Sequence, residues 1–328
     1  MWYNTVWNFS DRVILLHKLK DLLPAAVSLL LAVGMVAASE LLHEKEIIFP
    51  EITAVAIGAL AAPKQAWNTS ALRLFLTITA AAVLGVGIVF IPLPLALKVP
   101  VALIAAVGCV TLSKTEFLPA VSACVLPVLL GTRSPIYIIS VAVMTALILA
   151  AQRIFIKAGI RQKYEFTPVN ADGKLFELRF IQIAAVSIIA MLPAMTGEIF
   201  FTAPPLIVAF FEMSKPQSKL LRHIPQALSL IVIAAVSGSA SRFFLTEKLG
   251  LPLTVSAAAA CAVILFAVCR VKLYFPPCGA IATLPLIVPS GALFRFPMEI
   301  AAGAIVLTIA ARIIAHRQAI LTKVLRQN

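Results

Sequence analysis

The segment VKLYFPPCGAIATLPLIVP, Val271–Pro289, is strongly apolar, yet it contains four prolines and a glycine. Proline fits the first turn of a helix, and the residue before a proline is pushed into extended geometry. The segment therefore predicts a short extended stretch followed by a helix that begins near Pro276. Gly279, Ala280 and Ala282 give this helix one smooth face, which lets another backbone or a ligand come close.

The composition shows which solvent surrounds this helix. Hydrophobic residues make up 61% of the 328-residue chain, charged residues 12%, and the mean hydropathy is +1.02. A soluble domain has about 25% charged residues. The chain is therefore predicted to be an integral membrane protein. Its long apolar runs do not alternate with polar residues, which favours membrane helices over a β-barrel.

The net charge of +13 does not indicate nucleic-acid binding, because the basic residues gather in tails and loops that flank apolar segments. The five cysteines form no Cys-x-x-Cys pair and lie at no zinc-binding spacing from a histidine, so they are interpreted as small packed residues. No phosphate loop, catalytic triad or metal cluster is visible. The sequence therefore predicts neither an enzyme nor a cofactor.

Twelve apolar segments follow one another, and they repeat in order. A membrane-spanning helix needs about 20 residues, so four segments are too short to be simple spans. The predicted spans are Leu22–Leu42, Leu72–Ile91, Pro100–Leu112 (with a start nearer Leu95 as the alternative), Pro135–Ile156, Phe180–Met195, Pro225–Leu245, Leu251–Val268 and Met298–Ala315; the short segments are Pro50–Ala62, Leu118–Gly131, Pro204–Met213 and Pro276–Val288. The predicted organisation is a tail at 1–21, a first membrane repeat at 22–156, a linker at 157–179, a second repeat at 180–315 and a tail at 316–328.

The short segments pair between the two halves. SKTEFLPAVSACVLP (Ser113–Pro127) aligns with VKLYFPPCGAIATLP (Val271–Pro285), which places Lys114 on Lys272, Phe117 on Phe275 and Pro119 on Pro277. Likewise, Pro50 aligns with Pro204. The fold class is therefore predicted to be an all-α polytopic membrane protein with two tandem parallel repeats, each with about four full spans and two short proline-led half-helices.

Lysine and arginine concentrate in alternate loops, which predicts cytoplasmic N- and C-termini and a cytoplasmic linker. The basic charge suits a multi-pass protein of a bacterial inner (plasma) membrane, whose lipids are anionic. Membrane lipid is then a partner, and the sequence leaves a homo-oligomer open.

Paired, interrupted helices at matching positions of two halves are typical of a transporter's substrate site. A half-helix N-terminus at membrane depth carries unpaired N–H groups and a partial positive charge, which favours an anion. We therefore expect a small-anion site, with nitrite as one candidate. Its predicted residues are Pro50, Glu51, Phe117, Pro119, Pro204, Pro205, Phe275, Pro276, Pro277 and Gly279.

Charged residues near these helix starts are candidates for mechanism. Glu51 and Glu116 are candidates for proton coupling, although an acid at a helix start also stabilises that helix by itself. Lys114 and Lys272 are candidates for cations at a pore mouth, with anchoring at the cytoplasmic surface as the alternative.

The motif FPPCGAIA (Phe275–Ala282) resembles the signature of the HPP family of integral membrane proteins, in which a His-Pro-Pro run precedes small residues. TAPPLIVAFFEMSKPQSKLLRHIPQALS resembles the first hairpin region of that family. The resemblance covers roughly 180–315 and implies a membrane transport fold, with nitrite transport as the best-known family activity. Phe275 replaces the histidine, so any role of that histidine in protons or substrate is lost or moved here. The alternative function is a membrane scaffold or assembly protein that transports nothing.

Overall fold

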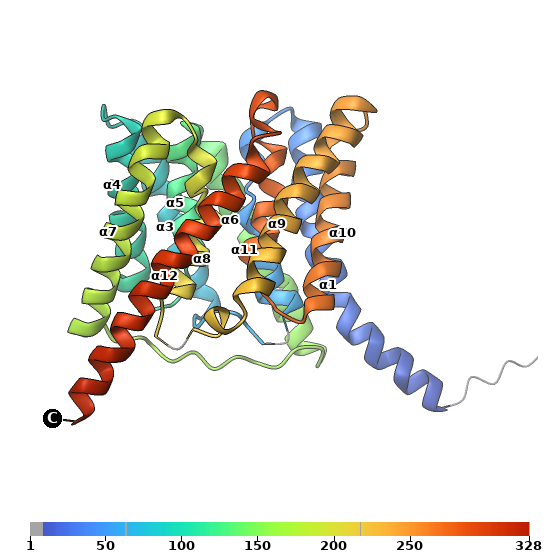
Figure 1. Ribbon diagram of the computed structural model, residues 1–328. Coiled ribbons are helices and arrows are strands. Elements are labelled where there is room, and N and C mark those ends of the chain that lie inside the picture. Colours follow the sequence, from blue (N-terminus) through green and yellow to red (C-terminus); the bar gives the residue numbers. More distant parts are fainter. Residues whose placement is uncertain (1–8, 63, 217, 328) are drawn as a thin grey trace, which may run out of the picture.

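The computed structural model describes residues 9–62, 64–216 and 218–327, with side chains described from 22 to 320 within these ranges. It is an all-helical bundle whose long helices run roughly side by side between two faces (Figure 1). The long helices are α1 (Phe9–Leu42), α3 (Ala71–Val89), α4 (Leu95–Leu112), α6 (Pro135–Lys157), α7 (Gly173–Thr196), α9 (Ile224–Ser241), α10 (Leu253–Val271) and α12 (Phe296–Gln327). Eight helices in the described part of the chain are long and apolar enough to cross a membrane. The protein is therefore a polytopic membrane protein.

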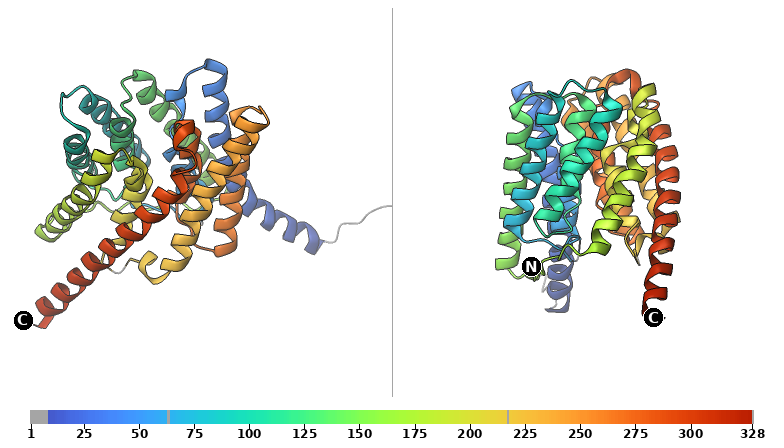
Figure 2. Two further views of the ribbon diagram at one scale, coloured as in Figure 1. Left: turned by 45° about the horizontal axis from the view of Figure 1, so that its top comes forward. Right: turned by 90° about the vertical axis from the view of Figure 1, so that its left-hand side faces the viewer.

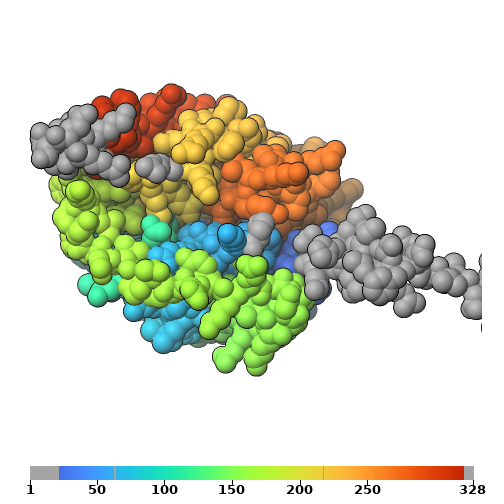
Figure 3. All heavy atoms as spheres, turned by 90° about the horizontal axis from the view of Figure 1, so that it is seen from below, coloured from blue at the N-terminus to red at the C-terminus, as the bar shows by residue number. Residues whose placement is uncertain are grey.

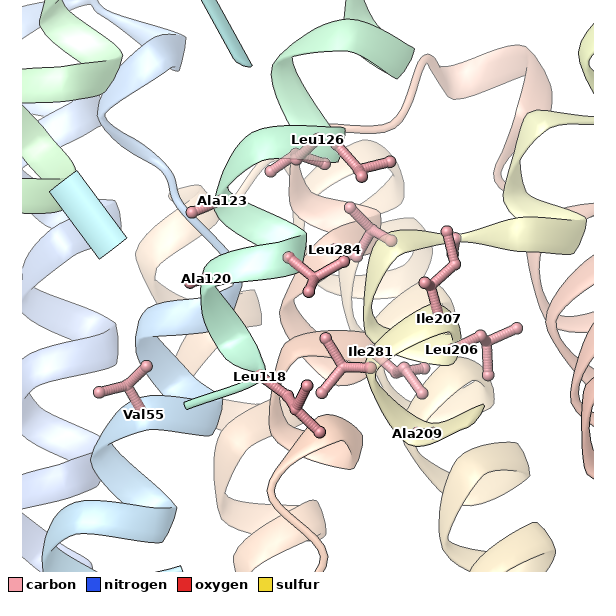
Figure 4. Close-up of a cluster of buried hydrophobic side chains, with 14 of the residues drawn as sticks. Val55, Leu118, Ala120, Ala123, Leu126, Leu206, Ile207, Ala209, Ile281 and Leu284 are labelled. Atoms are coloured by element: carbon pink, nitrogen blue, oxygen red, sulfur yellow. The ribbon is translucent and has the colours of Figure 1, made fainter. Parts of the chain in front are cut away.

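Four short helices lie inside this bundle: α2 (Glu51–Ala56), α5 (Pro119–Leu130), α8 (Pro204–Met213) and α11 (Pro277–Thr283). A wide π-helical turn, Ile57–Ala61, continues α2, and a 3-10 turn, Leu284–Leu286, continues α11. Every residue of α2 and α11 is buried, as is nearly all of α5 and α8. Figure 4 shows apolar side chains from all four short helices in one cluster, among them Val55, Leu126, Ile207 and Ile281.

Local sequence explains where these helices begin and end. Proline occupies the first turn of α5, α8 and α11. Backbone N–H groups in a first turn have no acceptor within the helix, so the N–H that proline lacks is not needed there. The side chain of Ser134 accepts a hydrogen bond at 3.2 Å from the N–H of Ile136 and so caps α6. Asp172 caps α7 in the same way, which starts this helix seven residues before the predicted Phe180. Gly131 ends α5 in the left-handed conformation at φ 70°.

The linker marks one face of the bundle, which we call the linker face. Asn68, in the loop between α2 and α3, bonds the linker residue Thr167, and Val169 of the linker donates to the carbonyl of Lys114 between α4 and α5. Figure 1 places the start of α1 and the end of α12 on this same side. Figure 2 shows both long terminal helices projecting from it. Each half therefore begins and ends on the linker face, so the two halves run parallel.

Contacts between the halves obey a pseudo-twofold relation. Helices α1 to α6 correspond in order to α7 to α12. Helix α1 packs on α10 while α7 packs on α4, and α2 packs on α11 while α8 packs on α5. The backbone repeats as well: Lys114 and Lys272, each five residues before the first proline of a short helix, both adopt the left-handed conformation, at φ 52° and 56°.

Two glycines bring long and short helices together in both repeats. A Cβ on Gly85 of α3 would lie 2.8 Å from the Cα of Cys124 and from the ring of Pro127 in α5. A Cβ on Gly238 of α9 would lie 2.9 Å from the ring of Pro285, just after α11. Each of these glycines therefore allows direct backbone contact between a spanning helix and a short helix.

Arginines close the carbonyl ends of the two short helices that pack on each other. Arg161 of the linker donates to the carbonyls of Leu60 and Ala62 at 2.5 and 2.7 Å, after α2. Burial lowers the pKa of the Arg161 guanidinium, which still stays protonated. At the opposite face, Arg242 donates to the carbonyl of Pro285 at 2.5 Å. Both short helices thus end on a fixed positive charge that suits the helix dipole.

Candidate functional site

The starts of all four short helices converge on one small internal space, which we call the closed site. Each helix supplies a pair of residues one turn apart. The lining is Glu51 and Ala54 of α2, Pro119 and Ser122 of α5, Pro205 and Val208 of α8, and Pro277 and Ala280 of α11, together with Pro276 and Trp67. Glu51 matches Pro205 in the repeat, and Pro119 matches Pro277. The closed site therefore lies on the pseudo-twofold axis of the fold.

The closed site is tight and nearly apolar. Its volume is about 10 Å³, the lower limit for holding one water molecule. A triatomic anion such as nitrite is larger than this space. The arrangement shown is thus a closed one, and a solute would enter only after side chains or short helices move.

Glu51 is the one ionisable residue among those lining the closed site. It is 1% exposed, and neither carboxyl oxygen has a hydrogen-bond partner. The buried hydroxyl of Ser122, across the same space, also lacks a partner. Buried polar groups are normally hydrogen-bonded, because an unmade bond costs roughly 1–3 kcal/mol and a lone charge costs far more. Glu51 and Ser122 thus face each other across one space without a full set of hydrogen bonds.

Three other titratable side chains on the helices packed around α2 make hydrogen bonds of their own. Tyr137 of α6 donates its hydroxyl to the carbonyl of Ala123 at 2.9 Å. The thiol of Cys278 in α11 lies 2.7 Å from the carbonyl of Phe275, and Cys124 of α5 bonds Ala102. No lysine or arginine lines the closed site. This environment tolerates the neutral acid form of Glu51 better than the carboxylate.

The sequence predicts that anion affinity comes from free N–H groups at the starts of the half-helices. In the structure, most of these N–H groups are absent or already hydrogen-bonded. Prolines remove several of these donors, and others bond carbonyls just before the helix: Thr53 N–H donates to Pro50, Val121 to Leu118, and Gly279 to Pro276. A tight first turn is the physical reason, since it satisfies donors locally. The helix dipoles remain, but the polar side chains of the closed site are Glu51 and Ser122.

All ten predicted site residues are buried, but they do not all reach the closed site. Glu51, Pro119, Pro205, Pro276 and Pro277 line it. The other five shape its walls. The carbonyls of Pro50 and Phe275 accept hydrogen bonds from Thr283 and Cys278, respectively. Phe117 packs edge-on against Trp67. Pro204 begins α8, and Gly279 packs on α2.

Gly279 is the clearest example of a wall residue. A Cβ there would lie 2.6 Å from the side chain of Ile57 and 3.1 Å from that of Thr53. Its smooth face therefore admits another backbone, that of α2, rather than a ligand.

A larger space, which we call the vestibule, opens on the linker face. It has a volume of about 790 Å³ and is lined by residues from the loops before α3, α5, α9 and α11 (in Figure 3 the loop before α3 is blue, the loop before α9 yellow and the loop before α11 orange). Its charged lining residues are Lys64, Lys215, Lys219 and Lys272 against Glu116 and Glu212. Lys215 forms an ion pair with Glu116 at 3.1 Å. The remaining three lysines form no ion pair with the described residues, so the vestibule carries excess positive charge.

The four charged residues predicted near the helix starts separate by location. Glu51 faces the closed site, whereas Glu116 and Lys272 line the vestibule. Lys114 is exposed and lines neither space, although it matches Lys272 in the repeat. Sequence reasoning missed Trp67, Ser122 and Glu212. Ser122 lies three residues after Pro119, one helical turn into α5, which is a usable signal; Trp67 and Glu212 meet only in the folded protein.

No group of three histidine, cysteine or acidic side chains that could hold a metal occurs among the residues described. No family model matches the chain, and no curated protein or solved structure matches it.

Proposed function

We propose that the protein carries a small anion across the membrane through the closed site, with Glu51 as the group that takes up and releases a proton. The observation that supports this proposal most is the convergence of four half-helices on one space that holds an unpartnered buried carboxyl group. The resemblance of Phe275–Ala282 to the HPP family points the same way and makes nitrite the first anion to test.

The vestibule and the closed site differ in charge and therefore have different proposed roles. The lysine-rich vestibule raises the local concentration of anions at one entrance. At the closed site, a carboxylate repels an anion, whereas a protonated Glu51 offers a hydrogen-bond donor. Uptake of a proton by the Glu51 carboxylate together with the anion leaves the net charge of the site unchanged, so no second negative charge is placed at membrane depth.

The proposal is tested by uptake into proteoliposomes with a panel of small anions that includes nitrite, nitrate, formate and acetate. We expect saturable uptake of at least one of them above the level of protein-free liposomes. If no anion is taken up under gradients of either sign, the transport proposal is wrong, and a non-transporting scaffold becomes the better account of the same fold.

Neutralising the vestibule should slow uptake without removing it. For the double variant Lys219→Gln/Lys272→Gln we expect the uptake rate at low salt to fall by about tenfold, within the range given for electrostatic steering. The difference should shrink above about 0.15 M salt, where the screening length is about 8 Å.

Lys114→Gln is the matched control, because Lys114 is the repeat counterpart of Lys272 but lies outside the vestibule. Equal slowing by Lys114→Gln and by Lys272→Gln alone, each of which removes one charge, would show that total charge, and not the vestibule, sets the rate.

A further inference from the structure

Trp67 lies where the vestibule and the closed site meet. Among the residues that the structure describes, Trp67 and Pro276 line both spaces. Pro276 is fixed at the start of α11, whereas Trp67 belongs to the non-helical segment 64–70 before α3. The indole is 3% exposed, although its segment lies on a face that opens to solvent. Trp67 is therefore the member of this boundary that is not built into a helix.

The indole is held on three sides. Its N–H donates to the carboxyl oxygen Oε1 of Glu212 at 2.9 Å. Its ring lies edge-on to Phe117, with ring centres 5.2 Å apart. Its far edge rests on Gly58, where a Cβ would lie 2.5 Å from ring atom Cζ3. A ring held in this way fills the passage between the two spaces.

Two of the three residues that hold the indole, Gly58 and Glu212, are counterparts in the repeat. Gly58 lies eight residues after Pro50, and Glu212 lies eight residues after Pro204. Where one repeat has a glycine that makes room for the ring, the other has an acid that accepts its N–H. The counterpart of Trp67 itself, seventeen residues after Pro204, is Leu221, which does not line the closed site. A single indole thus serves both halves at the pseudo-twofold axis.

The segment that carries Trp67 is fastened to the bundle by side-chain amides. Gln65 donates to the carbonyls of Trp67 and Thr69 at 2.9 and 2.8 Å, and its own oxygen accepts from Gln152 of α6 at 3.0 Å. A small number of hydrogen bonds at the edge of the bundle can open locally at lower cost than the packed core.

We infer that Trp67 is the gate between the vestibule and the closed site: the path is shut while the indole lies between Gly58 and Glu212, and it opens when the indole leaves. This inference gives the proposed function its inner barrier. Its test needs no transported substrate, so it can fail or succeed independently of the transport proposal.

The test measures access of a water-soluble thiol reagent to the closed site. In a background with all five cysteines replaced, Ser122→Cys places a thiol on the lining, and 2-aminoethyl methanethiosulfonate is added from the linker face. Labelling is read as the mass shift of the intact protein. Lys64→Cys, in the vestibule, is the positive control and should react in every variant.

With Trp67 present we expect slow labelling of Ser122→Cys, limited by rare opening. Trp67→Ala should speed it by at least about tenfold, because access then no longer waits for a local opening. Gly58→Ala should also speed it, since the added methyl group displaces the ring without deleting it. Phe166→Ala, which removes an aromatic ring that stacks on Arg73 away from both spaces, should leave the rate unchanged.

Two results would overturn the gate. One is labelling of Ser122→Cys as fast as Lys64→Cys while Trp67 is intact, which means that the path is already open. The other is unchanged slow labelling in both Trp67→Ala and Gly58→Ala, with Lys64→Cys still reactive, which places the barrier elsewhere. Using both variants separates these outcomes from misfolding of either one.

Discussion

Replacing Gly238 by alanine is expected to lower the free energy of unfolding by about 1–3 kcal/mol, the usual cost of overpacking a core. The added Cβ would meet the backbone carbonyl of Ala282 and the ring of Pro285, neither of which can rotate away. Since α9 would have to move off α11, the wall of the closed site should loosen as well. Gly85→Ala should cost a similar amount, because Gly85 meets Cys124 and Pro127 in the same way.

Gly87 supplies the matched control, on the same helix as Gly85. A Cβ at Gly87 would have no neighbour within 4 Å. Gly87→Ala should therefore leave stability unchanged or raise it slightly, because alanine restricts the unfolded chain. Thermal unfolding of the purified variants in one detergent measures the difference. Equal melting temperatures for Gly85→Ala and Gly87→Ala would contradict the close contact between long and short helices.

The sequence predicted much of this architecture because prolines and apolar length are local signals. Pro119, Pro204 and Pro277 begin helices in the structure, as the first-turn preference of proline implies. The eight long helices and the four short ones appear in the predicted order. The repeat could be aligned by its prolines alone, and Lys114 and Lys272 even share a left-handed backbone.

The partners of these segments could not be predicted in the same way. A glycine such as Gly279 indicates that something approaches, but the sequence does not say whether it is Thr53 of a neighbouring helix or a ligand. Trp67 and Glu212 are 145 residues apart, and neither belongs to a motif. Their contact depends on the pseudo-twofold packing of α2 on α11 and α8 on α5, which is a property of the whole bundle.

The free N–H groups expected at the half-helix starts illustrate a second limit. The rule that helix starts carry open donors holds for a regular first turn. Prolines at these positions remove some donors and tight turns satisfy others, so the helix dipole remains while most of the free donors are lost. As a result, the chemistry of the closed site depends on two side chains, Glu51 and Ser122, and on the field of the helices.

Glu51→Gln is expected to separate anion movement from proton movement. If one proton accompanies each anion, a gradient of one pH unit, acid outside, supplies about 1.4 kcal/mol and drives about tenfold accumulation inside. Glutamine keeps the size and the donor of a protonated Glu51 but cannot release a proton. The variant should therefore still equilibrate the anion, to a ratio near one, and should not respond to the sign of the pH gradient.

Glu116→Gln is the control for this experiment. Glu116 is the other acid near a half-helix start, but it lies in the vestibule and pairs with Lys215 at 3.1 Å. Its replacement should change the uptake rate modestly and leave the accumulation ratio at the wild-type value. Accumulation that persists in Glu51→Gln and is lost in Glu116→Gln would move the coupling site from the closed site to the vestibule.

Stability separates a coupling role for Glu51 from a structural one. A structural acid would have partners, and its loss would destabilise the protein; Glu51 has none among the described residues. Glu51→Leu, which removes an unsatisfied buried polar group, should keep or raise the melting temperature while it ends pH-driven accumulation. A residue that serves coupling usually costs the protein some stability, so its removal should not lower the melting temperature. A lower melting temperature for Glu51→Leu, with accumulation intact, would therefore assign Glu51 to the packing of α2.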